Sequence, residues 1–509
     1  MTLYSSFGIA GTSSQIHLAS IAGLKVLENG GNAFDAAITI SSVLTVLLPH
    51  TSSIGGDGFL LARDSSGNII AYNGSGRSPK NFPTSKYLEE KPLRGPLTVT
   101  VPGLVDLWGW LSENYCTRDL YELLKPAINL SRYGFYVQEA LANAIRRNYE
   151  SLRKYNSWIK TFGKLREGCY TRFTELAHIL EVIGRRGARE FYEGKIAEEL
   201  VEELSKQGVP LVYEDFASHR GEKVNPIKST YRDYEVYELP PNSQGVTTLE
   251  LLKLIEITNL NNREFNDEER IITFFNLALI AYKDRDMHVA DPCFYEYDPL
   301  QLIDEYALKK KLQEINVSTQ ENSNGNYLDK DTTFFVVGDR QGNIVGFIQS
   351  IFYPFGSGIV VKDIPFQNRG YGFSKKPGLP NSPLPRKRPM HTLSVLMAHH
   401  DNEGWYVIGC AGGDLRPQIH AEVFTNIADY KFSLSRAVDA PRFMLIERAP
   451  IKALAEEDLG LKKYPKWLNI IKPKSPHTGI VHALRYRKDH VYELVADVRG
   501  GGIAIPQVH

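Results

Sequence analysis

The stretch Asp331-Thr332-Thr333-Phe334-Phe335-Val336-Val337 decides how this chain folds and which chemistry it can perform. A polar loop, 318–331 (STQENSNGNYLDKD), ends at this stretch, and the apolar residues that follow predict a buried strand. The glycine-containing turn 339–343 leads into a second predicted strand, 344–350, so we expect a hairpin. Thr332 therefore stands at the head of a strand, directly after the kind of exposed polar loop in which chain cleavage concentrates.

The Asp331–Thr332 bond is interpreted as a self-cleavage site, because its cleavage would give Thr332 a free α-amino group beside its own hydroxyl. One residue then carries both a nucleophile and a base. An α-amino group has a pKa of about 7.7–8, so near neutral pH a useful fraction is unprotonated and can accept the hydroxyl proton. We expect the hydroxyl oxygen to attack an amide carbonyl and to form an acyl-threonine intermediate.

A pair of glycines, Gly412 and Gly413, follows a predicted buried strand at 405–410 and precedes a predicted helix at 418–430. Residues without a Cβ atom leave their amide N–H groups accessible to a ligand. An oxyanion needs such fixed donors, and losing one typically lowers kcat by about 10²–10³. The pair is a candidate oxyanion hole; a tight strand-to-helix turn is the alternative.

Many short motifs follow one another in a recognisable order. They include Gly30-Gly31-Asn32-Ala33, Ser53-Ile54-Gly55-Gly56-Asp57, Val101-Pro102-Gly103, Asp284-Arg285-Asp286, Asp331-Thr332-Thr333, Phe355-Gly356-Ser357-Gly358, Gln367-Asn368-Arg369-Gly370, Lys387-Arg388-Pro389, Gly412-Gly413-Asp414 and Ala440-Pro441-Arg442-Phe443. In this order they resemble the γ-glutamyltransferase (γ-glutamyl transpeptidase) family of N-terminal-nucleophile hydrolases. The resemblance covers nearly the whole chain.

This resemblance implies a mixed α/β (α+β) fold, the four-layer αββα sandwich of N-terminal-nucleophile hydrolases. It also implies self-cleavage into a large fragment, 1–331, and a small fragment, 332–509, which remain together as a heterodimer and form one domain. The family uses the glycine pair as its oxyanion hole. A hydroxyl at the position of Ser350 supports the nucleophile in the family, and Thr333 is a further candidate for such a role.

The residues expected to bind the substrate depart from the family pattern. The arginine position of the family holds Ser75, and Arg77 lies two residues further on, which is the same face of a strand. Arg77 is a candidate bidentate partner for a substrate carboxylate, or a surface arginine. The family's aspartate position holds Gly372, and His391-Thr392 replaces its serine pair. The site that would receive a glutamyl ammonium group is therefore expected to be altered.

Composition excludes some classes of partner. Lys+Arg and Asp+Glu both number 59, so no basic bias favours nucleic acid, and a small-molecule γ-glutamyl or other acyl-amide substrate is expected. Four widely spaced cysteines form neither a metal-ligand pair nor a disulfide framework. The longest apolar-rich run, 36–48, is too short to span a bilayer and predicts a buried helix. With no signal peptide at the N-terminus, the expectation is a cytoplasmic enzyme without cofactor or metal.

Three functions remain open from the sequence. The first is a self-processing enzyme that hydrolyses or transfers a γ-glutamyl group from glutathione-like amides. The second keeps this chemistry but acts on another acyl donor, in the manner of the family's glutaryl and cephalosporin acylases; the altered positions Ser75, Gly372 and His391 favour it. The third is an unprocessed, non-catalytic binding protein. The sequence is also compatible with assembly of the heterodimer into a higher oligomer.

Overall fold

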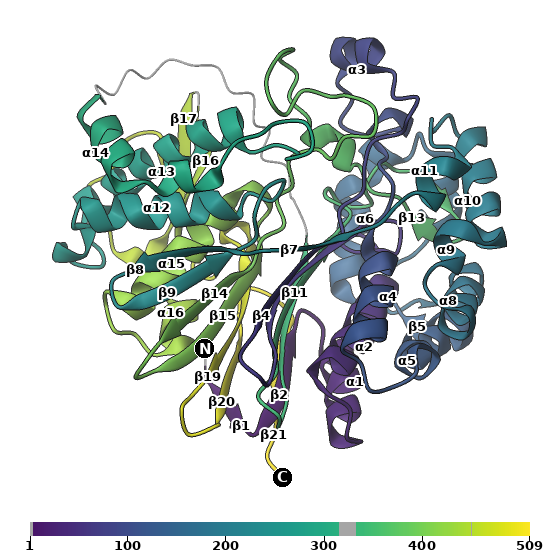
Figure 1. Ribbon diagram of the computed structural model, residues 1–509, viewed down its shortest axis with the longest axis horizontal. Helices are drawn as coiled ribbons and strands as arrows, with labels where there is room; N and C mark the ends of the chain where they lie inside the picture. Colours follow the sequence, from purple (N-terminus) through teal and green to yellow (C-terminus); the bar gives the residue numbers. More distant parts are fainter. Residues whose placement is uncertain (1–3, 315–331, 449) are drawn as a thin grey trace.

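The centre of the molecule is a pair of seven-stranded sheets packed face to face (Figure 1). The computed structural model describes residues 4–314, 332–448 and 450–509. The first sheet has the order β1 (Ser6–Gly8), β20 (Tyr492–Ala496), β19 (Ile480–Tyr486), β15 (Gly404–Ala411), β14 (Leu396–His400), β9 (Tyr234–Glu238) and β8 (Ile227–Tyr231). The second has the order β21 (Ile503–Gln507), β2 (Ala10–Ser14), β10 (Thr333–Gly338), β11 (Ile344–Ser350), β3 (Asp57–Arg63), β4 (Ile69–Asn73) and β7 (Glu222–Val224).

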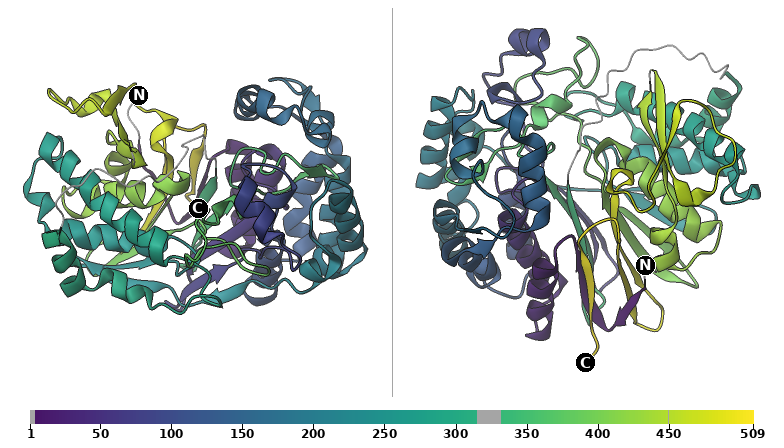
Figure 2. Two further views of the ribbon diagram at one scale, coloured as in Figure 1. Left: turned by 90° about the horizontal axis from the view of Figure 1, so that it is seen from above. Right: turned by 180° about the vertical axis from the view of Figure 1, so that it is seen from behind.

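Helices cover the outer face of each sheet, so the molecule has four layers in the order helix, sheet, sheet, helix (Figure 2). The helices beside the second sheet are α1 (His17–Glu28), α2 (Ala33–Leu47), α4 (Leu104–Asn114), α5 (Leu120–Tyr133), α6 (Glu139–Leu152), α8 (Thr174–Arg186) and α10 (Lys195–Lys206). Those beside the first sheet are α12 (Gly245–Ile257), α13 (Glu268–His288), α15 (Arg416–Ala428) and α16 (Leu434–Asp439). The αββα sandwich expected from the sequence is confirmed.

Shorter elements connect these layers. The short helices are α3 (Thr84–Glu90), α7 (Asn156–Thr161), α9 (Glu190–Glu193), α11 (Tyr213–Ala217) and α14 (Glu305–Glu314). The strands outside the two large sheets are β5 (Phe135–Tyr136), β6 (Tyr170–Thr171), β12 (Val360–Val361), β13 (Ile364–Pro365), β16 (Phe443–Arg448), β17 (Ile451–Glu456) and β18 (Leu468–Ile471).

The hairpin formed by β10 and β11 lies in the middle of the second sheet and is buried on both faces. Phe334 and Val336 pack between the two sheets, whereas Phe335 and Val337 pack against the helices. A strand covered on both faces needs apolar residues at every position, which is why this segment reads as a continuous apolar run. The predicted hairpin is therefore confirmed.

The buried helix predicted at 36–48 is α2, in which every residue is buried. Its N-terminus begins with a capping box: the Asn32 side chain accepts hydrogen bonds from the amides of Phe34 and Asp35, and the Asp35 carboxylate accepts one from the Asn32 amide at 2.8 Å. These bonds satisfy amide groups that the first helical turn leaves unpaired. They also fix where the helix begins beneath the central hairpin.

Both large sheets contain strands from before and after Thr332. In the second sheet, β10 pairs with β2 and β11 pairs with β3; in the first, β14 pairs with β9. The segments on either side of the predicted cleavage site thus share one sandwich. Within the described residues, no helix has both the length and the apolar character needed to cross a membrane.

The close contact between β15 and β10 gives a test of the sandwich. A Cβ atom at Gly409 would lie 2.5 Å from the Phe334 ring, so Gly409→Ala is predicted to overpack the space between the sheets. We expect a loss of about 1–3 kcal/mol and a lower melting temperature in thermal unfolding followed by circular dichroism. Gly501→Ala is the control, because no atom lies within 4 Å of the Cβ position there. Equal melting temperatures for the two variants would contradict the packing described.

Candidate active site

Thr332 immediately precedes β10 and is 2% exposed. By the two-residue period of the strand its side chain lies on the face of Phe334 and Val336, which is the space between the sheets. Its hydroxyl donates a hydrogen bond of 3.4 Å to Oγ of Ser350, at the end of the neighbouring strand β11. Asp331 lies outside the described residues, so the predicted cleavage site is visible only from its Thr332 side.

Contacts across the sandwich establish how β10 and β15 face each other. Gly346 pairs with Val336 in the hairpin, and a Cβ atom on Gly346 would lie 2.7 Å from the Val407 side chain. Gly409, two residues further along β15, lies against Phe334. A step of two residues toward the start of β10 therefore corresponds to a step of two residues toward the end of β15.

If this correspondence is extended by one step, Thr332 is expected at the level of Ala411, the last residue of β15, which precedes Gly412 and Gly413. Gly413 has a φ of +53°, a conformation that favours glycine and turns the chain from the strand into α15. Among the described residues, no backbone hydrogen bond is donated by the amide of Gly412 or of Gly413. Their use as an oxyanion hole stays a prediction, and this geometry is compatible with it.

Ser350 and Thr333 occupy different faces of the hairpin. Oγ of Ser350 accepts hydrogen bonds from the Thr332 hydroxyl and, at 2.8 Å, from the amide of Phe352. Thr333 faces the helical layer, and its hydroxyl donates to the carbonyl of Gln349 at 3.3 Å. Ser350 is therefore in contact with the predicted nucleophile, whereas the side chain of Thr333 is directed away from it.

The carboxylate of Asp57, at the start of β3, joins several segments beneath this site. Asp57 is opposite Ser350 in the sheet and is fully buried. It accepts hydrogen bonds at Oδ1 from the amides of Gly76 and Gly103, both at 3.1 Å, and from Nε2 of Gln367 at 3.0 Å, and at Oδ2 from Nε2 of His391 at 3.1 Å. Burial raises the pKa of Asp57 to about 6, although the nearby Arg369 and the hydrogen bonds oppose that rise.

Both ring nitrogens of His391 are used inside the protein. Nδ1 accepts a hydrogen bond from the amide of Leu393 at 3.2 Å, so the proton resides on Nε2 and is donated to Asp57. Burial, followed by the charges of Arg369 and Arg416, holds the pKa of His391 well below its usual value, so the ring is neutral. The structure thus gives His391 a part in supporting Asp57, and the predicted contact with substrate has no ring nitrogen left to make it.

The neighbouring Thr392 is bonded to Arg369 and, through Gln244, is connected to the turn at Gly413. Its hydroxyl accepts a hydrogen bond of 3.2 Å from Arg369, and its carbonyl accepts one of 3.0 Å from Nε2 of Gln244. The same Nε2 atom donates to the carbonyl of Gly413 at 3.0 Å. Gln244 therefore ties Thr392 to the glycine turn, and a substrate-binding role for Thr392 stays a prediction.

The structure does not bring Arg77 to this group. Its guanidinium forms ion pairs with Asp291 at 2.9 Å and Glu222 at 3.2 Å. Ser75, at the position of the family's arginine, is fully buried and bonds to the Asn73 side chain. The expectation that Arg77 binds a substrate carboxylate therefore finds no support in the geometry.

Gly372 ends a short 3-10 turn that begins at Arg369. A Cβ atom at Gly372 would lie 4.0 Å from Cδ of Arg369 and 2.9 Å from the Met390 carbonyl. Gly372 thus borders the stem of the arginine and leaves no room for a larger residue. No side chain at this position is available to bind a substrate.

Two charged residues of this site, Asp57 and Arg369, were given no role in the sequence analysis. Both lie in the motifs that carried the family resemblance, each next to a glycine. A charged residue directly beside a glycine in such a motif was the available signal. It could not be converted into a role, because the partners of Asp57 come from segments as far apart as Gly76 and His391.

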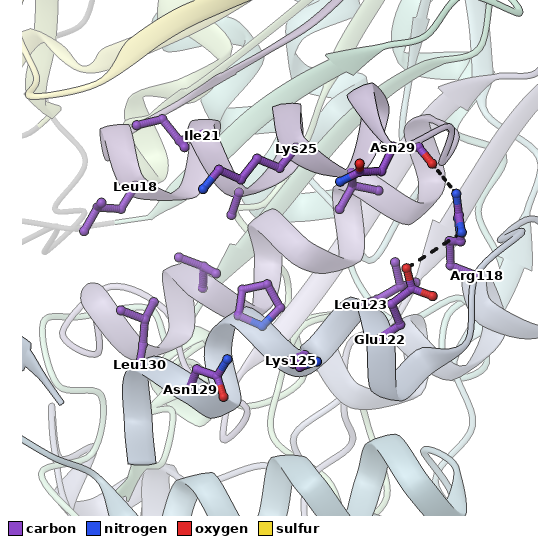
Figure 3. A pocket seen from close by; sticks show the side chains of 14 residues that line it. Leu18, Ile21, Lys25, Asn29, Arg118, Glu122, Leu123, Lys125, Asn129 and Leu130 are labelled. Carbon is purple, nitrogen blue, oxygen red and sulfur yellow. Dashed lines mark hydrogen bonds and ion pairs between the residues drawn. The ribbon is translucent and has the colours of Figure 1, made fainter. Parts of the chain in front are cut away.

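A surface pocket of about 440 Å³ lies elsewhere, between α1, α2 and α5 (Figure 3). Its lining is largely apolar, including Leu18, Ile21 and Leu130, with Lys25 and Lys125 among its polar residues. None of the residues grouped around Thr332 lines it. The pocket is separate from the candidate site.

Comparison with known proteins agrees with the fold and identifies the family. The family model for gamma-glutamyltranspeptidase matches residues 19–507. The glutathione hydrolase-like YwrD proenzyme of Bacillus subtilis is 32% identical over 96% of this chain and 97% of its own. The oxamate amidohydrolase proenzyme of Klebsiella pneumoniae is 31% identical over 84% of each chain.

Among solved structures, cephalosporin acylase from Bacillus halodurans superimposes with a TM-score of 0.89 and 28% identity, over 99% of this chain and 97% of its own. The chain belongs to the γ-glutamyltranspeptidase family, and like the relatives described it is an enzyme. The resemblance drawn from the short motifs is therefore confirmed.

The pKa of Asp57 predicts a pH dependence of stability. The folded protein holds the Asp57 proton up to a pH of about 6, whereas an unfolded chain releases it near 3.8. Between these values unfolding releases a proton, so a rise in pH lowers the contribution of Asp57 to the free energy of unfolding, by an amount on the order of 2 kcal/mol.

Urea unfolding of the wild type and of Asp57→Asn from pH 4 to pH 8, at one protein concentration, measures this contribution. The asparagine does not titrate, so the stability difference between the two proteins isolates the carboxyl group. We expect the wild type's advantage to shrink as the pH rises to about 6 and then to stay level. An advantage that grows over this range would mean that the folded state lowers the pKa of Asp57.

Proposed function

We propose that this chain is a self-processing amidohydrolase or acyltransferase whose nucleophile is Thr332. The observation that carries the proposal is the position of Thr332, buried between the sheets with its hydroxyl on Ser350 and the glycine turn at the same level of β15. This arrangement offers a nucleophile, a supporting hydroxyl and amide donors for an oxyanion in one place. The names of the relatives as proenzymes support the self-processing step.

Processing begins with attack of Thr332 Oγ1 on the carbonyl carbon of Asp331. The new C–O bond replaces the C–N bond, the hydroxyl proton passes to the released nitrogen, and an ester remains. Water hydrolyses this ester, which leaves a carboxylate on Asp331 and a free hydroxyl and α-amino group on Thr332. Fragments 1–331 and 332–509 then stay associated, since both large sheets take strands from each.

Turnover uses the same oxygen on an external amide. The α-amino group of Thr332 accepts the hydroxyl proton, Oγ1 bonds to the substrate carbonyl carbon, and the amides of Gly412 and Gly413 stabilise the oxyanion. The C–N bond breaks and the leaving amine takes the proton. Water or an amine acceptor then attacks the acyl-threonine ester, which gives hydrolysis or transfer respectively.

For the acyl donor we propose a γ-glutamyl or closely related amide. The names of the glutathione hydrolase-like relative and of the family model support a γ-glutamyl compound such as glutathione. A second candidate is an acyl group without the glutamyl ammonium, and a specific observation favours it. Arg77 is held by Asp291 and Glu222, and Gly372 stands where the family has its aspartate.

The proposal is tested by comparing the wild type with Thr332→Ala and Thr332→Ser. We expect the purified wild type to give two fragments on a denaturing gel, with the smaller beginning Thr332-Thr333-Phe334 in N-terminal sequencing. Thr332→Ala should remain one 57.4 kDa chain and Thr332→Ser should be cleaved more slowly. Only cleaved protein should release p-nitroaniline from γ-glutamyl or glutaryl p-nitroanilide.

Thr174→Ala, an exposed threonine at the start of α8, serves as the matched control and should be processed like the wild type. A wild-type chain that stays intact during long incubation and turns over no amide would overturn the proposal. That result would favour a binding protein with the same fold.

A further inference from the structure

Two buried arginines near Thr332 lack a carboxylate partner among the described residues. Arg369 and Arg416 are both fully buried, and neither forms a direct ion pair within the described chain, although the charge of Asp57 acts on Arg369. Other buried arginines of this chain are neutralised directly: Arg442 pairs with Asp497 at 2.6 Å, and Arg499 pairs with Asp497 at 3.1 Å and also with Glu456. A buried charge without a partner is costly to the folded state and marks a place where an opposite charge would bind.

The guanidinium of Arg369 is only partly used by the protein. One terminal nitrogen donates to the Thr392 hydroxyl at 3.2 Å, while Nε and the other terminal nitrogen have no hydrogen-bond partner within the described chain. The group lies 4.0 Å over the ring of Phe352, which supports the cation from one face. Nε and one terminal nitrogen are two donors on the same edge of the fork, the geometry that a carboxylate accepts.

Arg416 supplies a second, similar charge at the start of α15. Nε and one terminal nitrogen hold the Cys410 carbonyl at 3.1 and 3.0 Å, while the remaining nitrogen has no partner in the described chain. Burial lowers the pKa of Arg369 to about 9; the charge of Asp57 opposes this fall, and the charge of Arg416 adds to it. Arg369 thus contacts Thr392, and Arg416 holds the carbonyl of Cys410 and follows Gly413 by three residues.

Arg369 is linked to the predicted nucleophile through a short series of contacts. Its guanidinium lies over Phe352, whose amide donates to Oγ of Ser350 at 2.8 Å. The Thr332 hydroxyl donates to that same oxygen. On its other side, Arg369 contacts Thr392, which Gln244 ties to the glycine turn.

The acidic groups of this region are already occupied. Asp57 accepts its four hydrogen bonds from other segments, and none of them comes from Arg369. Asp414 has an ion pair with Arg285 at 3.5 Å. The region thus offers unused guanidinium nitrogens but no unused carboxylate for an ammonium group among these residues.

We propose that Arg369, assisted by the charge of Arg416, is the binding site for a carboxylate at the far end of the acyl group. The favoured substrate class is then the monoamides of small dicarboxylic acids, in which an α-ammonium group is not required. This inference rests on the proposed function for its substrate, but the anion site itself does not depend on cleavage. Hydrolysis of a glutaryl amide would release an amine and glutarate, whose carboxylate remains on Arg369 until it dissociates.

The test combines turnover and binding with the processed protein. Turnover of glutaryl p-nitroanilide is compared with that of the uncharged hexanoyl p-nitroanilide and of γ-glutamyl p-nitroanilide. In the wild type we expect kcat/KM for the glutaryl compound to exceed that for the other two by at least about 10-fold, from a charge-assisted hydrogen bond. Arg369→Gln should lower the glutaryl value by about 10- to 100-fold and leave the hexanoyl value nearly unchanged.

Arg436→Gln is the matched control. This exposed arginine also lies over a phenylalanine, Phe432, at 3.8 Å, but it is not part of the site, so all three rates should equal those of the wild type. Arg369→Lys keeps the charge and removes the planar fork, and should give an intermediate loss. Self-cleavage and thermal melting show whether Arg369→Gln folds. If it does not, the rates of Arg369→Lys are used in its place.

Calorimetric binding of glutarate, with glutaramide as the uncharged comparison, separates the two proposals. Glutarate binding that requires Arg369, in a protein that cleaves no amide, would sustain the anion site and reject the proposed enzyme. Equal loss of the glutaryl and hexanoyl rates in Arg369→Gln, or a preference of the wild type for the γ-glutamyl compound, would overturn the inference. So would glutarate binding that is the same in the wild type and in Arg369→Gln.

Discussion

The structure around Thr332 depends on one buried carboxylate, that of Asp57. Its two oxygens collect donors from the segments at Gly76, Gly103, Gln367 and His391, which are distant in sequence. The amide of Gly76 and Nε2 of His391 have no other acceptor in the described chain, and an unsatisfied buried group costs about 1–3 kcal/mol. Gln367 and the amide of Gly103 also donate to other acceptors, so Asp57 links them to this group without being their only partner. Since Asp57 stands opposite Ser350 in the sheet, the same interaction that joins these segments also positions the hydroxyl beside Thr332.

The sandwich and the site are built from the same residues. Gly346 on β11 and Gly409 on β15 let the two sheets approach closely. This close approach sets how β10 and β15 are aligned, and therefore which residue of β15 lies opposite Thr332. Two buried arginines belong to neighbouring segments: Arg369 begins a 3-10 turn and bonds to Thr392, and Arg416 begins α15 and bonds to the carbonyl of Cys410 near the end of β15. The predicted nucleophile is thus surrounded by buried residues of both sheets.

This chain has the fold of its family, but several residues near the candidate site differ from the family's pattern. The fold, the hairpin and the glycine turn follow the family, as does the similarity to both a glutathione hydrolase-like protein and a cephalosporin acylase. The residues that would select an acyl group differ from the family's pattern: Arg77 lies in its own ion pairs, His391 supports Asp57, and Arg369 offers unused donors. On the proposed function, substrate choice therefore depends on a few side chains within a fold that the family shares.

The sequence by itself determined the hairpin after Thr332, the buried helix α2 and the family, because these depend on local apolar patterns and on the order of short motifs. It could not determine which charged side chains share the site. Arg77 and Arg369 are both arginines in glycine-containing motifs, yet only the tertiary structure gave one of them carboxylate partners and left the other beside Thr392 without one. Such pairing is a long-range property, fixed when distant segments pack and exclude water, so no local pattern of residues specifies it.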